Sequence, residues 1–156
     1  MSTNSIGLDN SKSLELSNKL NDLLSNYQIF YMNVRGFHWN GKGNNFFELH
    51  LKFEELYDDL LLKVDEIAER VLTLGTRPLH SFSDYINNSE IKEVKDLTDG
   101  LNCVKNILDS FKVLLSKQRD ILSLSQENND EGTMSLMSDY IREQEKSVWM
   151  YSAYLA

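Results

Sequence analysis

The chain contains a single proline, Pro78, and its seven glycines are scattered, so long stretches contain no residue that would break a helix. Through most of these stretches apolar residues recur every three or four positions, which is the spacing of one face of an α-helix. At 156 residues the chain is long enough for one well-buried core and short for two. The sequence therefore predicts a single all-α domain.

Helical spacing of apolar residues divides the chain into four long helices. A short polar tail at residues 1–10 precedes the bundle domain, 11–156. The predicted helices cover about 11–38, 45–74, 98–125 and 133–154, with a short helix at about 83–87. The short helix lies in a connection that is long enough to return the chain to the far end of the bundle. This order predicts a four-helix bundle with one long crossover between its second and third helices, which is the connectivity of ferritin-like proteins.

The second predicted helix carries more apolar surface than contact with one core requires. One line of side chains has helical spacing and is expected to face the core: Phe46, Leu49, Phe53, Leu56, Leu60, Val64, Ile67 and Val71. A second line mixes apolar with ionisable residues: His50, Glu54, Tyr57, Leu61, Asp65, Ala68, Glu69 and Leu72. We expect this second face to contact another subunit.

Four ionisable residues near this helix form two pairs of candidate metal ligands. His38 and His50 flank a break at Gly41 and Gly43, so an antiparallel hairpin can bring the two imidazoles together. Asp65 and Glu69 are four residues apart and share one helix face. Imidazole and carboxylate together suit iron, zinc or manganese, whereas a chain with one cysteine cannot build a thiolate cluster.

Helix geometry limits how the two pairs combine. His50 and Asp65 are 15 residues apart on one predicted helix, which corresponds to ~22 Å along its axis. One ion with bonds of ~2 Å cannot join them within a chain. If two second helices pack antiparallel about a twofold axis, His38 and His50 of each chain meet Asp65 and Glu69 of the other. The sequence therefore predicts two equivalent sites shared between two chains.

Three segments of the sequence resemble the signature of the Dps family, the mini-ferritins also called DNA-binding proteins from starved cells. They read R-G-F-H-W-N, F-F-E-L-H-L-K-F-E-E-L-Y and V-D-E-I-A-E-R. The helix order, the long crossover and K-S-V-W near Trp149 extend the resemblance over nearly the whole chain. The resemblance implies a hollow dodecameric shell that oxidises ferrous iron, typically with hydrogen peroxide and otherwise with oxygen, and stores the ferric product inside. Such a reaction protects against oxidative damage.

The resemblance also assigns roles to particular residues. It implies four residues that are both metal ligands and catalytic residues of a ferroxidase site: His38, His50, Asp65 and Glu69. Trp39 is expected beside them, and Glu54 is expected to hold a second iron or to orient the other ligands. Iron is the expected metal, and the same ligands suit other divalent ions such as zinc.

Structural interpretations of the same residues stay open. Histidines such as these two are often simply buried or interfacial, and Asp65 and Glu69 could be partners for Lys63 and Arg70. The acidic turn before the last helix also allows two interpretations. Its carboxylates could line a pore at a threefold axis, or those next to the helix could stabilise its N-terminus through the helix dipole, and both could hold at once. The residues concerned are Glu127, Asp130 and Glu131.

Charge argues against one class of partner. The net charge is −8, and Lys12 is the only basic residue among the first twelve, whereas family members that bind DNA usually carry a lysine-rich tail. We therefore expect no direct DNA binding, although a DNA-packing shell with structural metal sites remains the alternative function. The N-terminus lacks the pattern of a signal peptide and no apolar run reaches 18 residues, so we expect a cytoplasmic protein without a membrane segment.

Overall fold

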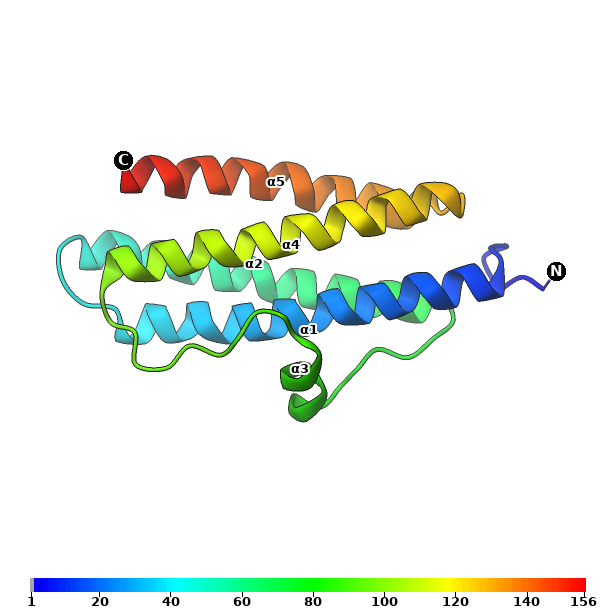
Figure 1. Ribbon diagram of the computed structural model, residues 1–156, viewed down its shortest axis with the longest axis horizontal. Coiled ribbons are helices and arrows are strands. Elements are labelled where there is room, and N and C mark those ends of the chain that lie inside the picture. The colour runs from blue at the N-terminus through cyan, green and yellow to red at the C-terminus, as the bar shows by residue number, and fades with distance from the viewer. Residues whose placement is uncertain (1) are drawn as a thin grey trace.

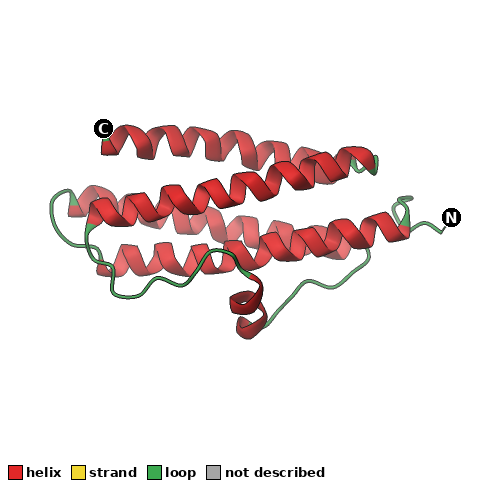
Figure 2. Cartoon of the chain, in the orientation of Figure 1, coloured by secondary structure: helices red, strands yellow, loops and turns green. Residues whose placement is uncertain are grey.

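Five α-helices make up the computed structural model, which describes residues 2–156 (Figure 1). They are α1 (Asn10–Asn40), α2 (Phe46–Thr73), α3 (Phe82–Asn88), α4 (Gly100–Glu127) and α5 (Glu131–Leu155). Within this range there is no strand, only two isolated β-bridges (Figure 2). The predicted all-α class is confirmed, and the long helices lie within a few residues of their predicted bounds.

The four long helices form a bundle in which α1 packs against α2, and α4 packs against α5 (Figure 1). The connection from α2 to α4 runs along the outside of α1 and carries α3 with it. This arrangement confirms the ferritin-like bundle with one long crossover. No helix in residues 2–156 has the length and apolarity needed to cross a bilayer.

The core fills the space between the four long helices with aliphatic and aromatic side chains. Phe30 of α1 and Phe111 of α4 meet edge to face with 5.2 Å between ring centroids. Full burial of each such side chain contributes roughly 1.5–3 kcal/mol. On α2 the predicted core line is buried at six positions: Leu49, Phe53, Leu56, Leu60, Ile67 and Val71. Val64 is half-buried, whereas the prediction for Phe46 is wrong, because this first residue of the helix is 37% exposed at the end of the bundle.

A closed ring of hydrogen bonds crosses the core between α1, α4 and α5. Tyr27 Oη donates to Gln118 Oε1 at 2.5 Å, Gln118 Nε2 donates to Gln144 Oε1 at 2.8 Å, and Gln144 Nε2 donates to Tyr27 Oη at 2.6 Å. All three side chains are almost completely buried. Because each of these groups has a partner, the ring avoids the cost of unsatisfied buried polar atoms and fixes the relative register of three helices.

Two asparagines of α1 hold the crossover against the bundle. Asn26 Oδ1 accepts from the backbone amides of Glu90 and Ile91, each at 3.0 Å. Asn33 Oδ1 accepts from the amide of Val94 at 2.9 Å, and its Nδ2 donates to the carbonyl of Lys92 at 2.9 Å. Both asparagines are buried, so they replace water as partners of the crossover backbone.

The N-terminal segment is hydrogen-bonded to the bundle. Asn4 Nδ2 donates to Ser13 Oγ at 3.1 Å and to the carbonyl of Leu74 at 3.3 Å. Asp9 then accepts from the amide of Lys12 and caps α1. Contacts of residues 2–10 therefore tie the start of α1 to the end of α2.

Candidate metal centre

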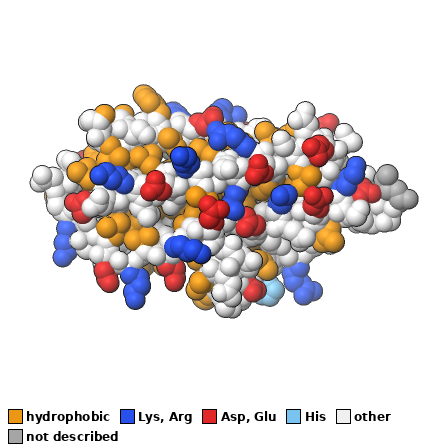
Figure 3. Space-filling view, viewed as in Figure 1, with side chains coloured by type: hydrophobic (Ala, Val, Ile, Leu, Met, Phe, Trp, Pro, Cys, Tyr) orange, Lys and Arg blue, Asp and Glu red, His pale blue; other side chains and the backbone are white. Residues whose placement is uncertain are grey.

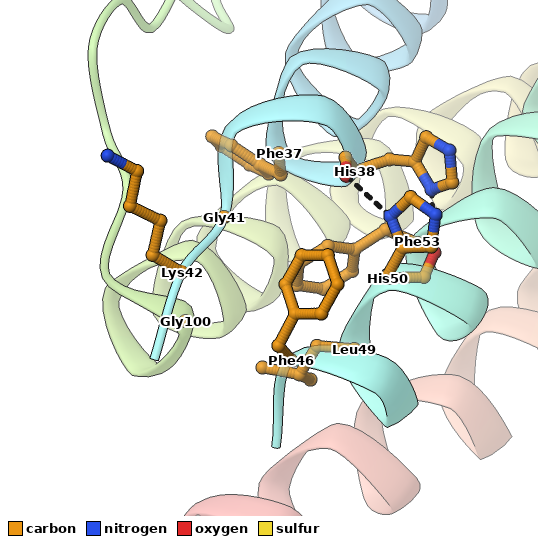
Figure 4. A pocket seen from close by; sticks show the side chains of 9 residues that line it. All are labelled: Phe37, His38, Gly41, Lys42, Phe46, Leu49, His50, Phe53 and Gly100. Carbon is orange, nitrogen blue, oxygen red and sulfur yellow. Dashed lines mark hydrogen bonds between the residues drawn. The ribbon is translucent and has the colours of Figure 1, made fainter. Parts of the chain in front are cut away.

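The two histidines that the sequence singles out meet across the turn between α1 and α2 (Figure 4). Their imidazole rings are stacked, with 3.8 Å between centroids and 15° between ring planes. Nδ1 of His38 lies 2.6 Å from the carbonyl oxygen of His50, and Nδ1 of His50 lies 2.8 Å from the carbonyl oxygen of His38. The hairpin therefore does bring the two imidazoles together.

The end of α1 explains this exchange of hydrogen bonds. The carbonyl of His38 lies in the last turn of the helix, where backbone acceptors lack an intrahelical partner. The amide four residues ahead, that of Lys42, donates instead to the carbonyl of Thr98 at 2.7 Å. His50 supplies the missing donor. Gly41 is required at this point, because a Cβ on it would lie 2.8 Å from the carbonyl oxygen of Phe37.

The hydrogen bonds also determine which imidazole nitrogen can bind an ion. A carbonyl oxygen only accepts, so Nδ1 carries the hydrogen in both histidines, and in the neutral ring the lone pair lies on Nε2. Histidines that bind metals usually have their other ring nitrogen held in this way. Nε2 of His38 lies 3.6 Å from Oε1 of Glu54, so a carboxylate stands beside the available nitrogen.

Aromatic side chains pack against both histidine rings. Phe46 stacks on His50 with 5.2 Å between centroids, and Tyr57 meets His38 edge-on at 5.3 Å. Burial, with the negative charges of Glu54 and a neighbouring aspartate, raises the pKa of the Tyr57 phenol. The cavity lined by both rings has a volume of only about 10 Å³, about the space of one water molecule.

Trp39, the aromatic expected beside the site, lies on the outside of α1 and is 58% exposed. The guanidinium carbon of Arg35 lies 4.7 Å from its ring centroid. Trp149 is also exposed, at 65%. Neither tryptophan belongs to the core of the single chain.

Asp65 and Glu69 are both exposed on α2, and their carboxylates form no ion pair or hydrogen bond with any of residues 2–156. Their alternative partners are occupied elsewhere. Lys63 pairs with Asp59 at 2.8 Å and with Glu143 at 3.0 Å, and Arg70 pairs with Asp130 at 2.7 Å. The interpretation of Asp65 and Glu69 as partners of these two basic residues is therefore wrong.

Within one chain the histidines and the two carboxylates stay apart. Residues 2–156 contain no group of three or more His, Cys, Asp or Glu side chains placed to hold one ion. The face of α2 that carries Asp65 is instead unusually apolar for an exposed surface. Its exposed large side chains are Phe47, Leu51, Leu61, Leu62 and Leu72.

Lys63 is a buried charge that sequence reasoning missed. It is only 4% exposed, and its Nζ lies 5.1 Å from the ring centroid of Tyr140. Burial alone would lower its pKa, but hydrogen bonds and charge from Asp59 and Glu143 outweigh burial and raise it. A signal was present, because Lys63 lies three residues after Leu60 and four before Ile67 on the core face.

The acidic turn before α5 contains one structural carboxylate. Asp130 is 2% exposed and accepts hydrogen bonds from Arg70 Nη2, from the amide of Thr133 and from Thr133 Oγ1, at 2.7, 3.0 and 2.6 Å. The capping interpretation holds for Asp130, whose carboxylate cannot line a pore while it is enclosed in this way. Glu127 and Glu131 are exposed.

The sequence of the chain is similar to a protein family and to individual proteins of bacteria. The family model of the ferritin-like domain matches residues 17–156 of the chain. The chain is 55% identical over 153 residues to an uncharacterised protein of Haemophilus influenzae, with 98% of this chain and 96% of that protein covered. It is 43% identical to a DNA protection during starvation protein of Porphyromonas gingivalis, over 86% of this chain and 85% of that one.

A solved structure agrees along the whole chain. The Dps protein of Vibrio cholerae O1, described as a member of a broad superfamily of ferritin-like diiron-carboxylate proteins, superposes with a TM-score of 0.98 and 60% identity. The match covers 100% of this chain and 98% of that protein. Sequence, helix order and fold thus lead to one conclusion: the chain belongs to the Dps family of ferritin-like proteins.

Proposed function

We propose that this protein is a ferroxidase that oxidises ferrous iron at sites shared between two subunits and stores the ferric product inside a dodecameric shell. One observation carries the proposal. The histidine pair keeps Nε2 free beside Glu54, while Asp65 and Glu69 have no partner within residues 2–156 of their own chain. Each group of donors is incomplete alone, and the two together make a mixed imidazole and carboxylate site suited to iron.

The exposed face of α2 supports a second copy of the chain as the source of the missing ligands. It carries leucines and a phenylalanine next to the unpaired carboxylates, which is a surface suited to burial against another protein. Two α2 helices packed antiparallel about a twofold axis would bring Asp65 and Glu69 of one subunit to His38 and His50 of the other. Such an isologous contact creates two identical sites.

The proposed chemistry uses iron as the substrate. Two ferrous ions each lose one electron, and one molecule of hydrogen peroxide takes both electrons with two protons to give two water molecules. Paired transfer avoids releasing hydroxyl radical, which would make the reaction protective. The carboxylates favour the ferric product, the imidazoles retain the ferrous ion, and Glu54 would hold a second iron or orient the first ligands. Oxygen is the alternative oxidant, and zinc suits the same ligands.

We do not include direct DNA binding in this proposal. The net charge is −8, and acidic and basic side chains are interspersed over the face of the molecule that Figure 3 shows. A protein that neutralises phosphates needs a concentration of lysine and arginine. A DNA-packing shell with structural metal sites therefore remains the less supported function, and we place the iron reaction in the cytoplasm.

Anaerobic addition of ferrous iron followed by a pulse of peroxide tests the proposal. Wild-type protein should bind ferrous iron, oxidise it rapidly and keep the ferric product in solution in a particle of dodecamer mass. His50→Ala should lose rapid oxidation, whereas His80→Ala, which changes an exposed histidine of the crossover, should behave like wild type. Equal rates in His50→Ala and wild type would refute the ferroxidase site.

A further inference from the structure

The side chain of Arg35 is held in place by neighbouring side chains but has no carboxylate partner among residues 2–156. Its guanidinium carbon lies 4.7 Å from the ring centroid of Trp39 and 5.9 Å from that of Tyr31. Arg35 Nη1 also donates a hydrogen bond to Tyr31 Oη at 3.2 Å. Arg70, Arg119 and Arg142 each pair with a carboxylate of their own chain. Arg35 is thus positioned by aromatic side chains and has its charge available.

Two observed contacts fix the level of Arg35 along α2. His38 meets His50, and Tyr31, seven residues earlier on α1, meets Tyr57, seven residues later on α2. The two helices are therefore antiparallel, and each step of one residue back along α1 corresponds to one residue forward along α2. Arg35, three residues before His38, lies level with the position three residues after His50.

The proposed dimer places a particular carboxylate at that level. If His50 of one subunit shares an ion with Asp65 and Glu69 of the partner subunit, His50 lies level with positions 65–69 of the partner helix. The two helices are antiparallel, so the position three residues after His50 lies level with positions 62–66 of the partner. Asp65 lies in this range, on the exposed face of α2 and without an ion pair to any of residues 2–156.

We propose that Arg35 pairs with Asp65 of the partner subunit when no metal is bound, and that it thereby weakens the hold of the site on divalent cations. This inference rests on the proposed intersubunit site. An arginine keeps its charge at all relevant pH values and can bind a carboxylate through two donors. A divalent ion must then compete with the guanidinium for Asp65, so Arg35 acts as a specificity and positioning residue and not as a ligand.

Titration of the metal-free protein with Co²⁺, followed by its visible absorption, tests the role of Arg35. A charge within about 4–6 Å changes the affinity of a carboxylate for a proton tenfold or more, so Arg35→Gln should bind Co²⁺ about tenfold more tightly than wild type. Arg35→Lys should stay close to wild type. Arg119→Gln, which removes an exposed arginine between α4 and α5, is the matched control and should have no effect.

A second background identifies the partner carboxylate. In Asp65→Asn protein, the further change Arg35→Gln should no longer tighten Co²⁺ binding, because the carboxylate that it neutralised is gone. An unchanged Co²⁺ dissociation constant in Arg35→Gln alone, with binding lost in His38→Ala/His50→Ala, would overturn the role of Arg35 and leave the metal site intact. Wild-type Co²⁺ binding in the double histidine variant would overturn the proposed site itself.

Assembly is measured by particle mass in the same samples. Arg35→Met also removes the charge but keeps an apolar stem against Trp39, so its Co²⁺ binding should match that of Arg35→Gln. All three variants should keep the wild-type particle mass, because the shared site exists only in the assembled dimer. Tighter Co²⁺ binding by Arg35→Gln and Arg35→Met at unchanged mass would support the ion pair, and loss of the dimer in Arg35→Gln would contradict the role given to Arg35.

Discussion

Replacing Asp130 should destabilise the protein much more than replacing its exposed neighbour Glu131. Asp130 is 2% exposed, accepts from two donors of Thr133 and pairs with Arg70 at 2.7 Å. Loss of an N-cap costs about 1 kcal/mol. Loss of a charge-assisted hydrogen bond that leaves a largely buried guanidinium without its partner costs about 1.5–3 kcal/mol more. Asp130→Ala should therefore lower the free energy of unfolding by about 2.5–4 kcal/mol.

The assay is thermal unfolding by calorimetry, with all variants at one protein concentration because subunit association also affects the melting temperature. For a chain of this size, 1 kcal/mol corresponds to about 2–4 °C, so Asp130→Ala should melt about 5–15 °C below wild type. Glu131→Gln should remain within about 0.5 kcal/mol of wild type, as exposed positions usually do. Equal melting temperatures for the two variants would refute the structural role given to Asp130.

Three further predictions follow from other contacts. Gly132→Ala should lower the melting temperature, because a Cβ would lie 2.7 Å from Arg70 Nη2, which the ion pair with Asp130 holds in place. Gly36→Ala has open space and should be neutral or stabilising. Burial, with the charge of Asp99, raises the pKa of the Cys103 thiol from 9.0 to about 11, so stability present below pH 9 is lost between about pH 9 and 11. This part of the pH dependence should disappear in Cys103→Ala, and an identical slope in wild type and variant would contradict it. Purified protein should not retard plasmid DNA at physiological salt in a gel without added divalent metal, and clear retardation would show that DNA binding needs no basic tail.

The sequence predicts the helices and the histidine pair because both depend on local order. Periodic apolar residues define a helix without knowledge of its partners, and the glycines between His38 and His50 require a turn that returns the chain on itself. The exchange of hydrogen bonds between the two residues was not predictable. It depends on α1 continuing to Asn40, which leaves the carbonyl of His38 without a helical donor.

Contacts between distant segments account for what the sequence leaves open. The enclosure of Asp130 depends in part on Arg70, 60 residues earlier in the chain. Lysine is a residue type of the surface, but Lys63 has the spacing of a core position. The ion pair with Glu143 of α5 stabilises its buried charge. No pattern within α2 reveals that partner. The same limitation applies to Asp65, whose proposed partners belong to another subunit.

The most direct test of the shared site mixes two inactive chains. One carries His38→Ala and His50→Ala, and the other carries Asp65→Ala and Glu69→Ala. With random pairing, about half of the dimers contain both chains, and each mixed dimer has one complete site and one site without any of these four ligands. Ferrous oxidation should therefore recover to about a quarter of the wild-type rate, although each parent is nearly inactive. No recovery, in particles shown by mass to contain both chains, would contradict a site shared between subunits.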